Sequence, residues 1–531
     1  MIKKTYIITM LLIMFQSLLM KTTAQDYQWC VSIDGYTSTE TNSNPEAFLW
    51  IPSDCNKVRG IILSQQNMSE EPILNNIKFR KTLQELGYGI IWIAPSIDQE
   101  WNIQKGCQKL FEKMMNDFAN KSGYNELSTV PIIPIGHSAM ATFPWNFAAW
   151  NNDRTLAIIS YHGDAPCTNL TGFGRENIQW GRTRNIDGIP GLMIEGEWEW
   201  WEARVNPALS FRMKYPNSCI SFLCDAGHGH FDVSDEVIDY MCMFLKKADY
   251  YRLNHNGLRK LNPTDGWLAE RWNTNTINRQ HTALYSEYKG DKHDAFWYFD
   301  KDIALATEQY YARSLGKKIQ YIGYKQGAKF VTYNPSSHAE IISYPILHKD
   351  GRTFNISAVY CDSTRSKLSS EHSCIKIKTR LINGPAIQIN DTTFCLDLYR
   401  IGLNNYRRST DIWLQAISDG DSNYKGTAQQ INIHFPYRIT DGKRQSIYFE
   451  SLQDVKRNTK AISLKGKSDS GLPVCYYVKY GPAHISGNHL VIDNIPPKTK
   501  YPIEVSVVAW QYGIKGKYQT AENVEHKFLI K

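Results

Sequence analysis

The chain has 531 residues, and at about 150 residues per domain this length suits about three folded units better than a single core. Hydrophobic residues make up 42% and charged residues 21%, which is typical of folded globular proteins and argues against long disordered segments. Lys and Arg outnumber Asp and Glu by 60 to 52. The resulting net charge of +8 is spread without a basic block, which disfavours nucleic-acid binding and leaves an acidic polymer acceptable as a substrate.

The N-terminus has the pattern of a secretory signal peptide. Lys3 and Lys4 precede an apolar run from Tyr6 to Met20, and small residues ending at Ala24 follow it. A charged start, a short apolar core and a small-residue cleavage site predict a signal peptide over residues 1–24 and a mature protein in the periplasm or outside the cell. The run is too short and wrongly flanked for a membrane span, so we expect no transmembrane segment.

All 11 cysteines lie in the predicted mature part, and their number is odd. The spacing allows two local disulfides, Cys30 with Cys55 and Cys361 with Cys374. Several buried free thiols are an equally good interpretation. None of the cysteines has a C-x-x-C spacing, so the cysteines give no sign of a metal site.

Residues 25–250 alternate between apolar runs and segments with helical periodicity, which predicts a mainly parallel sheet covered by helices on both faces. The predicted strands are Ala47–Ile51, Gly60–Leu63, Gly89–Ala94, Val130–Ile135, Leu156–Ser160, Gly191–Ile194 and Cys219–Leu223. The predicted helices are Lys78–Leu86, Gln104–Phe118, Ala139–Trp150 and Ser234–Lys247.

The rest of the chain divides into three parts. Residues 251–337 are rich in Trp and Tyr and include a predicted helix over Lys301–Leu315; we expect them to form an extension packed on the first domain, where the aromatics either line a cleft or join two domains. Regular short strands predict a β-sandwich over 338–440 and another over 441–531. The last segment, with Ser470–Val474 and Val508–Gln511, resembles the immunoglobulin-like modules of secreted bacterial enzymes.

The segment that points to chemistry is Gly136-His137-Ser138, where an apolar strand runs into a predicted helix. A sharp strand-to-helix turn holds a serine hydroxyl exposed beside a base, and a glycine two residues earlier removes a side chain that would clash in the turn. The backbone N–H of Ala139 would then face a developing oxyanion. The usual second glycine of G-x-S-x-G is replaced by Met140, which weakens the motif.

Acid and base candidates follow later strands in the order expected for a Ser–acid–His triad. Glu199 follows the predicted strand Gly191–Ile194 and is the preferred acid. Glu197, Glu202 and Asp164 are alternative acids.

Two histidines follow the strand Cys219–Leu223, just before the last helix of the domain. We take His228 as the base and His230 as a residue that lines the pocket or caps that helix. A metal site built from these histidines and Asp225 or Asp232 is disfavoured, because no further ligand cluster stands out.

With these motifs in place, residues 27–250 resemble the α/β-hydrolase superfamily, and the domain layout resembles exported bacterial carbohydrate esterases such as pectin methylesterases. The resemblance implies Ser138 as nucleophile, His228 as general base, Glu199 as acid and no cofactor. It also implies an oxyanion hole formed by Ala139 and a donor from the loop after Gly60–Leu63, where Gln66 or Asn67 is expected. Trp198 and Trp200, beside the acid, are candidates for stacking on sugar rings; a helix that packs its tryptophans into the core is an equally good interpretation.

The sequence thus predicts a secreted serine esterase that removes methyl, acetyl or feruloyl groups from a plant polysaccharide or oligosaccharide through an acyl-enzyme. A secreted peptidase of the same fold is the nearest alternative. A glycan-binding protein on a hydrolase scaffold is the alternative from another class, and an intact Ser–His pair would argue against it. A glycosidase using Glu197 and Glu199 is disfavoured, because carboxylates on one short loop are poorly placed to flank a glycosidic bond.

Overall fold

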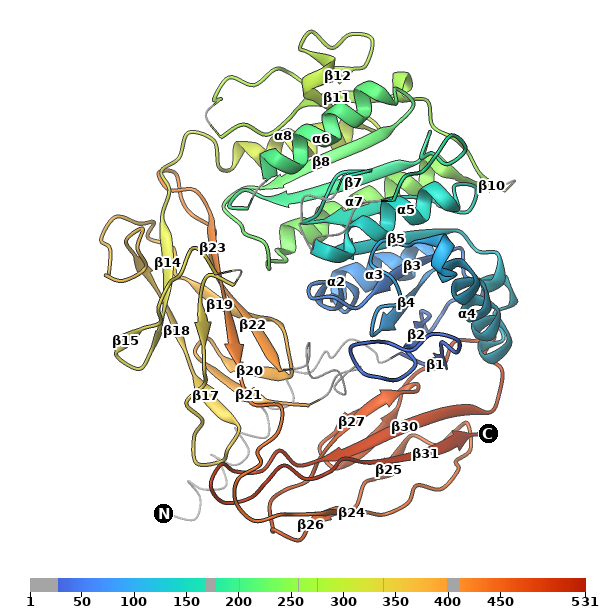
Figure 1. Cartoon of the computed structure of the whole chain (residues 1–531), viewed down its shortest axis with the longest axis vertical. Coiled ribbons are helices and arrows are strands. Elements are labelled where there is room, and N and C mark those ends of the chain that lie inside the picture. Colours follow the sequence, from blue (N-terminus) through green and yellow to red (C-terminus); the bar gives the residue numbers. More distant parts are fainter. Residues whose placement is uncertain are drawn as a thin grey trace.

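The computed structural model describes residues 27–168, 178–199, 201–255, 257–274, 276–337, 339–398 and 410–531. The predicted signal peptide lies outside these residues. The N-terminal half is built on an eight-stranded sheet in the order β1-β2-β4-β3-β5-β6-β7-β8, with helices on both faces (Figure 1). Many small antiparallel sheets follow it. The structure thus confirms the predicted fold class: an α/β-hydrolase domain followed by β-rich regions.

Six strands of the large sheet, β3 to β8, run parallel; at one edge β2 pairs antiparallel with β4, and β1 pairs antiparallel with β2. The strands are β1 (Trp29–Ser32), β2 (Glu46–Trp50), β3 (Gly60–Gln65), β4 (Tyr88–Ala94), β5 (Ile132–His137), β6 (Ile158–Tyr161), β7 (Pro190–Gly196) and β8 (Cys219–Asp225). Most of their residues are buried on both faces, which is why they appear in the sequence as apolar runs without polar alternation.

The helices of this domain are α2 (Glu70–Leu74), α3 (Ile77–Leu86), α4 (Cys107–Ser122), α5 (Thr142–Trp150), α6 (Trp201–Lys214) and α7 (Asp235–Arg252). The bounds of α3 have local causes: the Asn76 side chain accepts from the backbone N–H of Lys78 and Phe79, and Gly87 ends the helix at φ 70°. Among the described residues, no helix is long and apolar enough to span a membrane.

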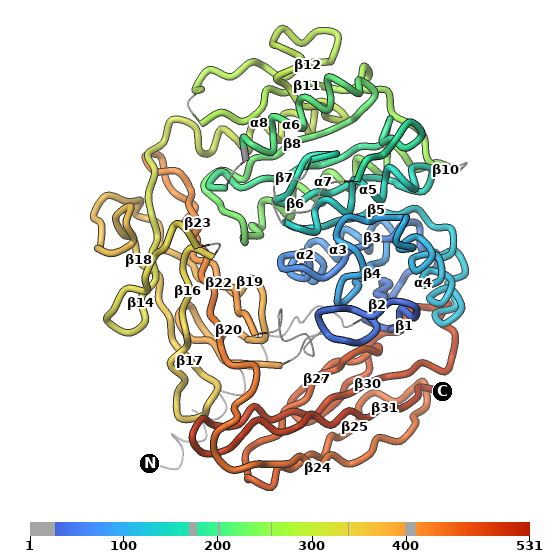
Figure 2. Tube along the Cα trace, in the orientation of Figure 1, coloured from blue at the N-terminus to red at the C-terminus, as the bar shows by residue number. Residues whose placement is uncertain are grey.

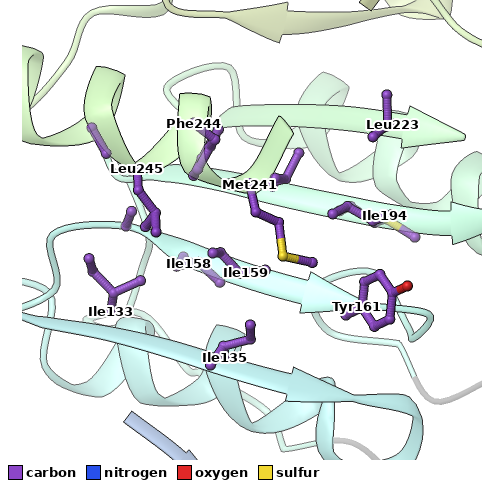
Figure 3. Packing of buried hydrophobic residues seen from close by; sticks show 14 of the residues in the cluster. Ile133, Ile135, Ile158, Ile159, Tyr161, Ile194, Leu223, Met241, Phe244 and Leu245 are labelled. Carbon is purple, nitrogen blue, oxygen red and sulfur yellow. The ribbon is translucent and has the colours of Figure 1, made fainter. Parts of the chain in front are cut away.

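Alternating side chains of the strands enter two separate cores, one on each face of the sheet. In β4, Ile90 and Trp92 join the core that includes α3 and α7, whereas Ile91 and Ile93 join the core that includes α4. Figure 3 shows the first of these cores, with Met241, Phe244 and Leu245 of α7 packed over β5 to β8. The parallel strands are held between these helical layers, and their carboxyl ends meet at one edge.

The aromatic-rich extension packs against β8. It contains β9 (Leu253–Asn254), β10 (Gly257–Leu258), β11 (Trp267–Glu270), β12 (Ala283–Leu284), β13 (Ala295–Tyr298) and α8 (Lys301–Ala312). The rings of Phe222 and Phe296 lie 5.0 Å apart, and the Tyr298 hydroxyl donates to the Phe222 carbonyl at 2.6 Å. Trp272, Trp297 and Tyr298 are at most 2% exposed. Two roles were considered for these aromatics: lining a cleft, or joining the hydrolase domain to the next domain. Their burial against β8 favours the second role.

The first β region comprises β14 to β23, and two of its strands, β14 and β15, fall within the segment predicted as extension. Its strands are β14 (Tyr321–Gln326), β15 (Lys329–Phe330), β16 (Ile342–Ser343), β17 (Thr353–Asn355), β18 (Ser357–Cys361), β19 (Lys378–Asn383), β20 (Ala386–Asn390), β21 (Thr393–Leu396), β22 (Asp411–Ser418) and β23 (Thr427–His434). The four-stranded sheet β16-β23-β22-β19 faces the hydrolase domain (Figure 1).

The second β region returns the chain to the hydrolase domain. Its strands are β24 (Ile447–Phe449), β25 (Ala461–Ser463), β26 (Gly466–Ser468), β27 (Cys475–Tyr480), β28 (Ala483–Ser486), β29 (His489–Ile492), β30 (Ile503–Trp510) and β31 (Val524–Ile530). Figure 2 shows these strands beside β1, β2 and α4. The Gly481 N–H donates to the Tyr27 carbonyl, and the Lys500 N–H donates to the Ser122 carbonyl, both at 2.8 Å.

All eleven cysteines are free thiols in the structure, so the two disulfides considered from the sequence are not formed. Eight of the eleven are buried, Cys167 and Cys475 are partly buried, and Cys374 alone is exposed. Burial raises the pKa of thiols such as Cys219 and Cys242, as expected for inert core residues.

We expect Phe296→Ala to lower the free energy of unfolding by about 3–5 kcal/mol, because it leaves a cavity against Phe222 at the edge of the sheet. Urea denaturation followed by tryptophan fluorescence measures the loss. Leu305→Ala on α8 is the control, since Leu305 is 38% exposed and should cost much less. Equal losses in the two variants would show that the extension is not part of the hydrolase core.

Candidate active site

Ser138 lies in the turn that joins β5 to η3 (Ser138–Met140) and then to α5. Its φ is 55°, in the left-handed region that costs a non-glycine residue about 1–2 kcal/mol. The chain is tight here: a Cβ on Gly136 would lie 2.1 Å from the Met140 carbonyl oxygen, so only glycine fits. The structure therefore has the strained strand-to-helix turn that the sequence predicted.

The missing second glycine is compensated elsewhere. The Met140 side chain is fully buried in the core on the α4 side of the sheet. The close approach between the turn and the neighbouring strand falls at Gly163, just after β6, where a Cβ would lie 2.1 Å from the Ala141 Cβ. Gly163 thus provides the space that Met140 cannot.

His230, not His228, contacts the serine. His230 Nε2 lies 2.8 Å from Ser138 Oγ, and the loop between β8 and α7 carries it there. The preference for His228 was therefore wrong about the geometry: its Nδ1 pairs with Asp232 and lies 3.5 Å from Asp225. The flanking acids at positions −3 and +4 are the sequence signal that could have marked His228 as an ion-paired residue.

Glu199 contacts His230 on the side away from the serine. His230 Nδ1 donates to Glu199 Oε2 at 2.5 Å, which leaves Nε2 free to accept from the serine hydroxyl. Arg204 donates to the same oxygen at 2.7 Å, and the Gly196 N–H donates to Oε1 at 2.7 Å. Burial alone would raise the pKa of Glu199, but His162, His230 and Arg204 outweigh it and hold the pKa well below its usual range. Glu199 is thus a carboxylate in the position of a triad acid.

The alternative acids lie elsewhere. Both carboxylate oxygens of Glu197 accept from Lys425, in the loop just before β23, at 2.9 and 2.7 Å. Neither side chain is more than 6% exposed. Asp164 is fully buried, with one oxygen 3.9 Å from Arg204 Nε. Glu202 is exposed on α6. The pairing of Glu197 with Lys425 also removes the pair of free carboxylates that a glycosidase would need.

Arg204 is buried between acids and not open to a substrate carboxylate. It is 2% exposed and donates to Glu195 and Glu199 at 2.7 Å each. Burial raises the pKa of Glu195 well above its usual range, although Arg204 opposes the shift. A buried guanidinium shared by two glutamates fixes the orientation of Glu199, at the cost of desolvating all three groups.

Two further histidines, which the sequence analysis did not single out, hold the backbone of His230. His137 Nε2 lies 2.9 Å and His162 Nδ1 2.7 Å from the His230 carbonyl oxygen. A carbonyl only accepts, so both rings donate to it. Burial lowers the pKa of both histidines, which keeps them neutral donors. The φ of 51° at His162, directly after β6, is a backbone feature that no sequence pattern reveals.

Of the backbone N–H groups predicted to bind the oxyanion, only that of Ala139 has a suitable position. The Ala139 N–H lies at the start of η3, where the first N–H groups of a helical turn lack intrahelical partners. The Gln66 N–H instead donates to the Ile93 carbonyl at 2.7 Å, and the Asn67 N–H donates to Glu70 at 3.2 Å. In this structure, then, neither of these backbone groups is the second donor.

Asn67 and Glu70 brace the nucleophile turn from the neighbouring loop. The Asn67 side-chain amide donates to the His137 carbonyl at 2.8 Å, and Glu70 accepts from the His137 N–H at 2.8 Å. Both backbone groups of the residue before Ser138 are therefore held, one by the loop after β3 and one by the first residue of α2. This contact explains how a strained turn is kept in place.

The structure gives little support to the predicted stacking of sugar rings on Trp198 and Trp200. Trp198 is half-buried, with its ring 6.5 Å from Tyr321, and Trp200 lies outside the described residues.

Asp225, His228 and Asp232 form a compact group whose spacing would suit a metal ion. Burial alone would lower the pKa of His228, but Asp225 and Asp232 raise it to about 9. We interpret the group as an ion pair, because His228 bonds Asp232 directly and Asp232 also accepts from the Gln415 side chain.

The three histidines around Ser138 have a similar spacing. His137 and His162 already donate to the His230 carbonyl, and the His230 ring bonds Ser138 and Glu199. Their ring nitrogens serve a hydrogen-bond chain, which does not match a ligand set.

No model of a known protein family matches the chain, and no curated protein matches it. Solved structures with similarity include MGS-M1, an alpha/beta hydrolase enzyme from a Medee basin deep-sea metagenome library, at 9% identity and a TM-score of 0.31; the match covers 43% of this chain and 98% of that one. Est1E from Butyrivibrio proteoclasticus matches at 17% identity and a TM-score of 0.28, covering 42% and 99%. A truncated carbohydrate esterase from gut microbiota matches at 14% identity and a TM-score of 0.29, covering 43% and 98%. The α/β-hydrolase fold is assigned from this chain's own strand order and from the turn at Ser138.

The charged His228 predicts a pH-dependent stability. Its pKa is raised from 6.5 to about 9 in the folded state, so its contribution of about 3 kcal/mol is complete below pH 6.5 and is lost as the pH rises through about 9. We expect the urea midpoint of the parent to fall between pH 7 and pH 10, and that of His228→Gln to fall less. His293→Gln, in an exposed pair with Asp291, is the matched control. Equal pH dependence in parent and His228→Gln would contradict the charge assignment.

Proposed function

We propose that this protein is a serine hydrolase that cleaves carboxylic esters, with Ser138 as nucleophile, His230 as general base and Glu199 as the acid. The observation that carries the proposal is the continuous chain of hydrogen bonds from Ser138 Oγ through His230 to Glu199, at 2.8 and 2.5 Å. A serine hydroxyl is a weak nucleophile without such a base. The three residues come from the carboxyl ends of β5, β7 and β8, where this fold carries its chemistry.

In the first half of the reaction, His230 Nε2 takes the hydroxyl proton as Ser138 Oγ attacks the ester carbonyl carbon. Glu199 holds Nδ1 protonated and stabilises the imidazolium that forms. The Ala139 N–H donates to the oxyanion of the tetrahedral intermediate. His230 then gives its proton to the departing alcohol oxygen, and the acyl group remains on Ser138.

In the second half, His230 takes a proton from water as the water oxygen attacks the acyl carbon. Collapse of the second tetrahedral intermediate returns the proton to Ser138 Oγ and releases the carboxylic acid. Arg204 keeps Glu199 oriented through both steps, and the neutral His137 and His162 keep the His230 backbone in place. None of these three residues needs to change its protonation state.

For the substrate, we propose methyl, acetyl or feruloyl esters on a polysaccharide or oligosaccharide, acted on outside the cytoplasm. The signal-peptide pattern of residues 1–24, the tryptophans beside the acid and the two β regions support this narrower proposal by analogy with the layout of exported carbohydrate esterases. A peptidase of the same fold would use the same triad. A pure glycan-binding protein would not need the bond between Ser138 and His230, and this observation favours an enzyme.

We expect Ser138→Ala and His230→Ala each to lower kcat on p-nitrophenyl acetate by about 10⁴-fold or more. Neither should lose much affinity, because both groups act on the reacting atoms. His434→Ala, at an exposed pair with Asp411, is the control. His228→Gln should keep far more activity than His230→Ala; the reverse order would contradict the assignment of the base. Labelling by a fluorophosphonate should be lost in Ser138→Ala.

The narrower proposal is tested with a panel of methylated, acetylated and feruloylated plant polysaccharides. We expect the parent to release one of methanol, acetate or phenolic acid, and Ser138→Ala to release none. Activity on small esters without release from any polymer would reject the polysaccharide substrate and retain the esterase. Cleavage of peptide substrates by the parent but not by Ser138→Ala would favour the peptidase.

A further inference from the structure

The loop that carries His230 lies between the hydrolase domain and the first β region. On the hydrolase side, His137 and His162 donate to the His230 carbonyl. On the other side, β23 contacts the loop before His230, and β19 and β22 contact it after His230. A histidine on a loop must be held within about 0.5 Å of its productive position to act as a base. What holds this loop therefore matters for catalysis.

The start of the loop is attached to the residues just before and within β23. Lys425 binds Glu197, and Glu197 in turn accepts from the Gly227 N–H at 2.8 Å. The Gly227 carbonyl accepts from the Ala428 N–H at 2.9 Å. Gly227 has a φ of 84°, and a Cβ there would lie 2.2 Å from the Gly426 carbonyl oxygen. Two glycine-rich backbones thus approach more closely than side chains would permit.

The end of the loop is attached to β19 and β22. Gln415 is fully buried and donates from its side-chain amide to Asp232. Arg380 donates to the Val233 carbonyl and, at 2.6 Å, to the Gln415 side-chain oxygen. Between the two attachments, the ring of Phe231 lies 4.2 Å from that of Trp413 and 4.6 Å from that of His230. The first β region therefore contacts this loop both before His230, at Gly227, and after it, at Phe231 and Asp232.

The ion pair between Lys425 and Glu197 also links this loop to the acid loop. Glu197 is two residues before Glu199, and the Trp198 N–H donates to the His228 carbonyl at 3.0 Å. A Cβ on Gly196 would lie 2.7 Å from the same carbonyl oxygen, so the two loops are in direct backbone contact. One lysine from the first β region thereby reaches the loops that carry both Glu199 and His230.

We infer that Lys425 and Gln415 are positioning residues for the proposed triad, so that the first β region is part of the catalytic unit and not only an appendage for binding polymers. Lys425 acts through Glu197 and Gly227 at the start of the loop, and Gln415 acts through Asp232 at its end. Neither touches the reacting atoms. The inference rests on the proposed esterase activity.

The test is the hydrolysis of p-nitrophenyl acetate by the full-length chain, because a small soluble ester needs no polymer-binding surface. We expect Lys425→Met to lower kcat about 10- to 100-fold with KM changed by less than about 2-fold, since a displaced base slows the chemical step without altering binding. Lys425→Arg should recover most of kcat. Lys378→Met is the matched control in the same region, because Lys378 forms an exposed pair with Asp419.

A second set of variants separates positioning from folding. Lys425→Met leaves the buried carboxylate of Glu197 without a compensating charge, which could prevent folding. The double variant Lys425→Met/Glu197→Gln removes the carboxylate charge and so removes this cause of misfolding. We expect the double variant to fold and still to show a reduced kcat and a slower rate of fluorophosphonate labelling. Gln415→Leu should reduce kcat in the same way from the other end of the loop.

The outcomes distinguish this inference from the proposed function. A parental kcat in folded Lys425→Met, in the double variant Lys425→Met/Glu197→Gln or in Gln415→Leu would overturn the positioning role. A reduced kcat in these three, with recovery in Lys425→Arg, supports it. A larger change in KM than in kcat would also overturn it and would make the first β region a binding element. If the parent hydrolyses no ester and Ser138 is not labelled, the proposed function itself fails.

Discussion

The parallel register of β5, β7 and β8 is the constraint on which the site depends. Parallel strands buried between two helical layers end at the same edge, and the loops that follow them must meet there. Ser138, Glu199 and His230 come from positions up to 92 residues apart and are joined only by this arrangement. The strained turn at Ser138 persists because the strand before it and the helix after it are packed on both sides, and because Asn67 and Glu70 hold the residue before it.

Charge compensation is the second requirement of the site. Glu199, Glu195 and Arg204 are buried together, and burying any one of them alone would cost several kcal/mol. The group therefore acts as a unit: His162, His230 and Arg204 together keep the pKa of Glu199 low, and Glu199 keeps His230 in the tautomer that can accept the serine proton. The buried charges of His228, Asp225 and Asp232 compensate one another in the same way, two residues before His230 in sequence. There the charged form of the histidine is stabilised, which suits a structural residue and not a base that must accept a proton near neutral pH.

The β-rich second half of the chain contacts the hydrolase domain at two places. Its second region returns to contact Tyr27, just before β1, and the end of α4, and its first region contacts the loop that carries His230. The contacts in the first region are specific polar ones between nearly fully buried groups, such as Lys425 with Glu197. Buried polar groups of this kind are costly unless every partner is in place, so they favour one relative placement of the two domains.

The sequence by itself determined the fold class and most strands and helices of the hydrolase domain, because these follow from local patterns. It also singled out Ser138 and Glu199, which the structure brings together with His230. Buried strands appear as apolar runs, amphipathic helices as 3.6-residue repeats, and Gly136-His137-Ser138 marks a tight turn between them. The choice between His228 and His230 was decided only by the tertiary structure. Both residues follow the same strand, and the direction in which each ring points depends on the irregular backbone of the loop and on Asp225, Asp232 and Gln415 around it. The same holds for Lys425, whose partner Glu197 lies 228 residues earlier: no local pattern encodes a contact that forms only when two folded domains pack together.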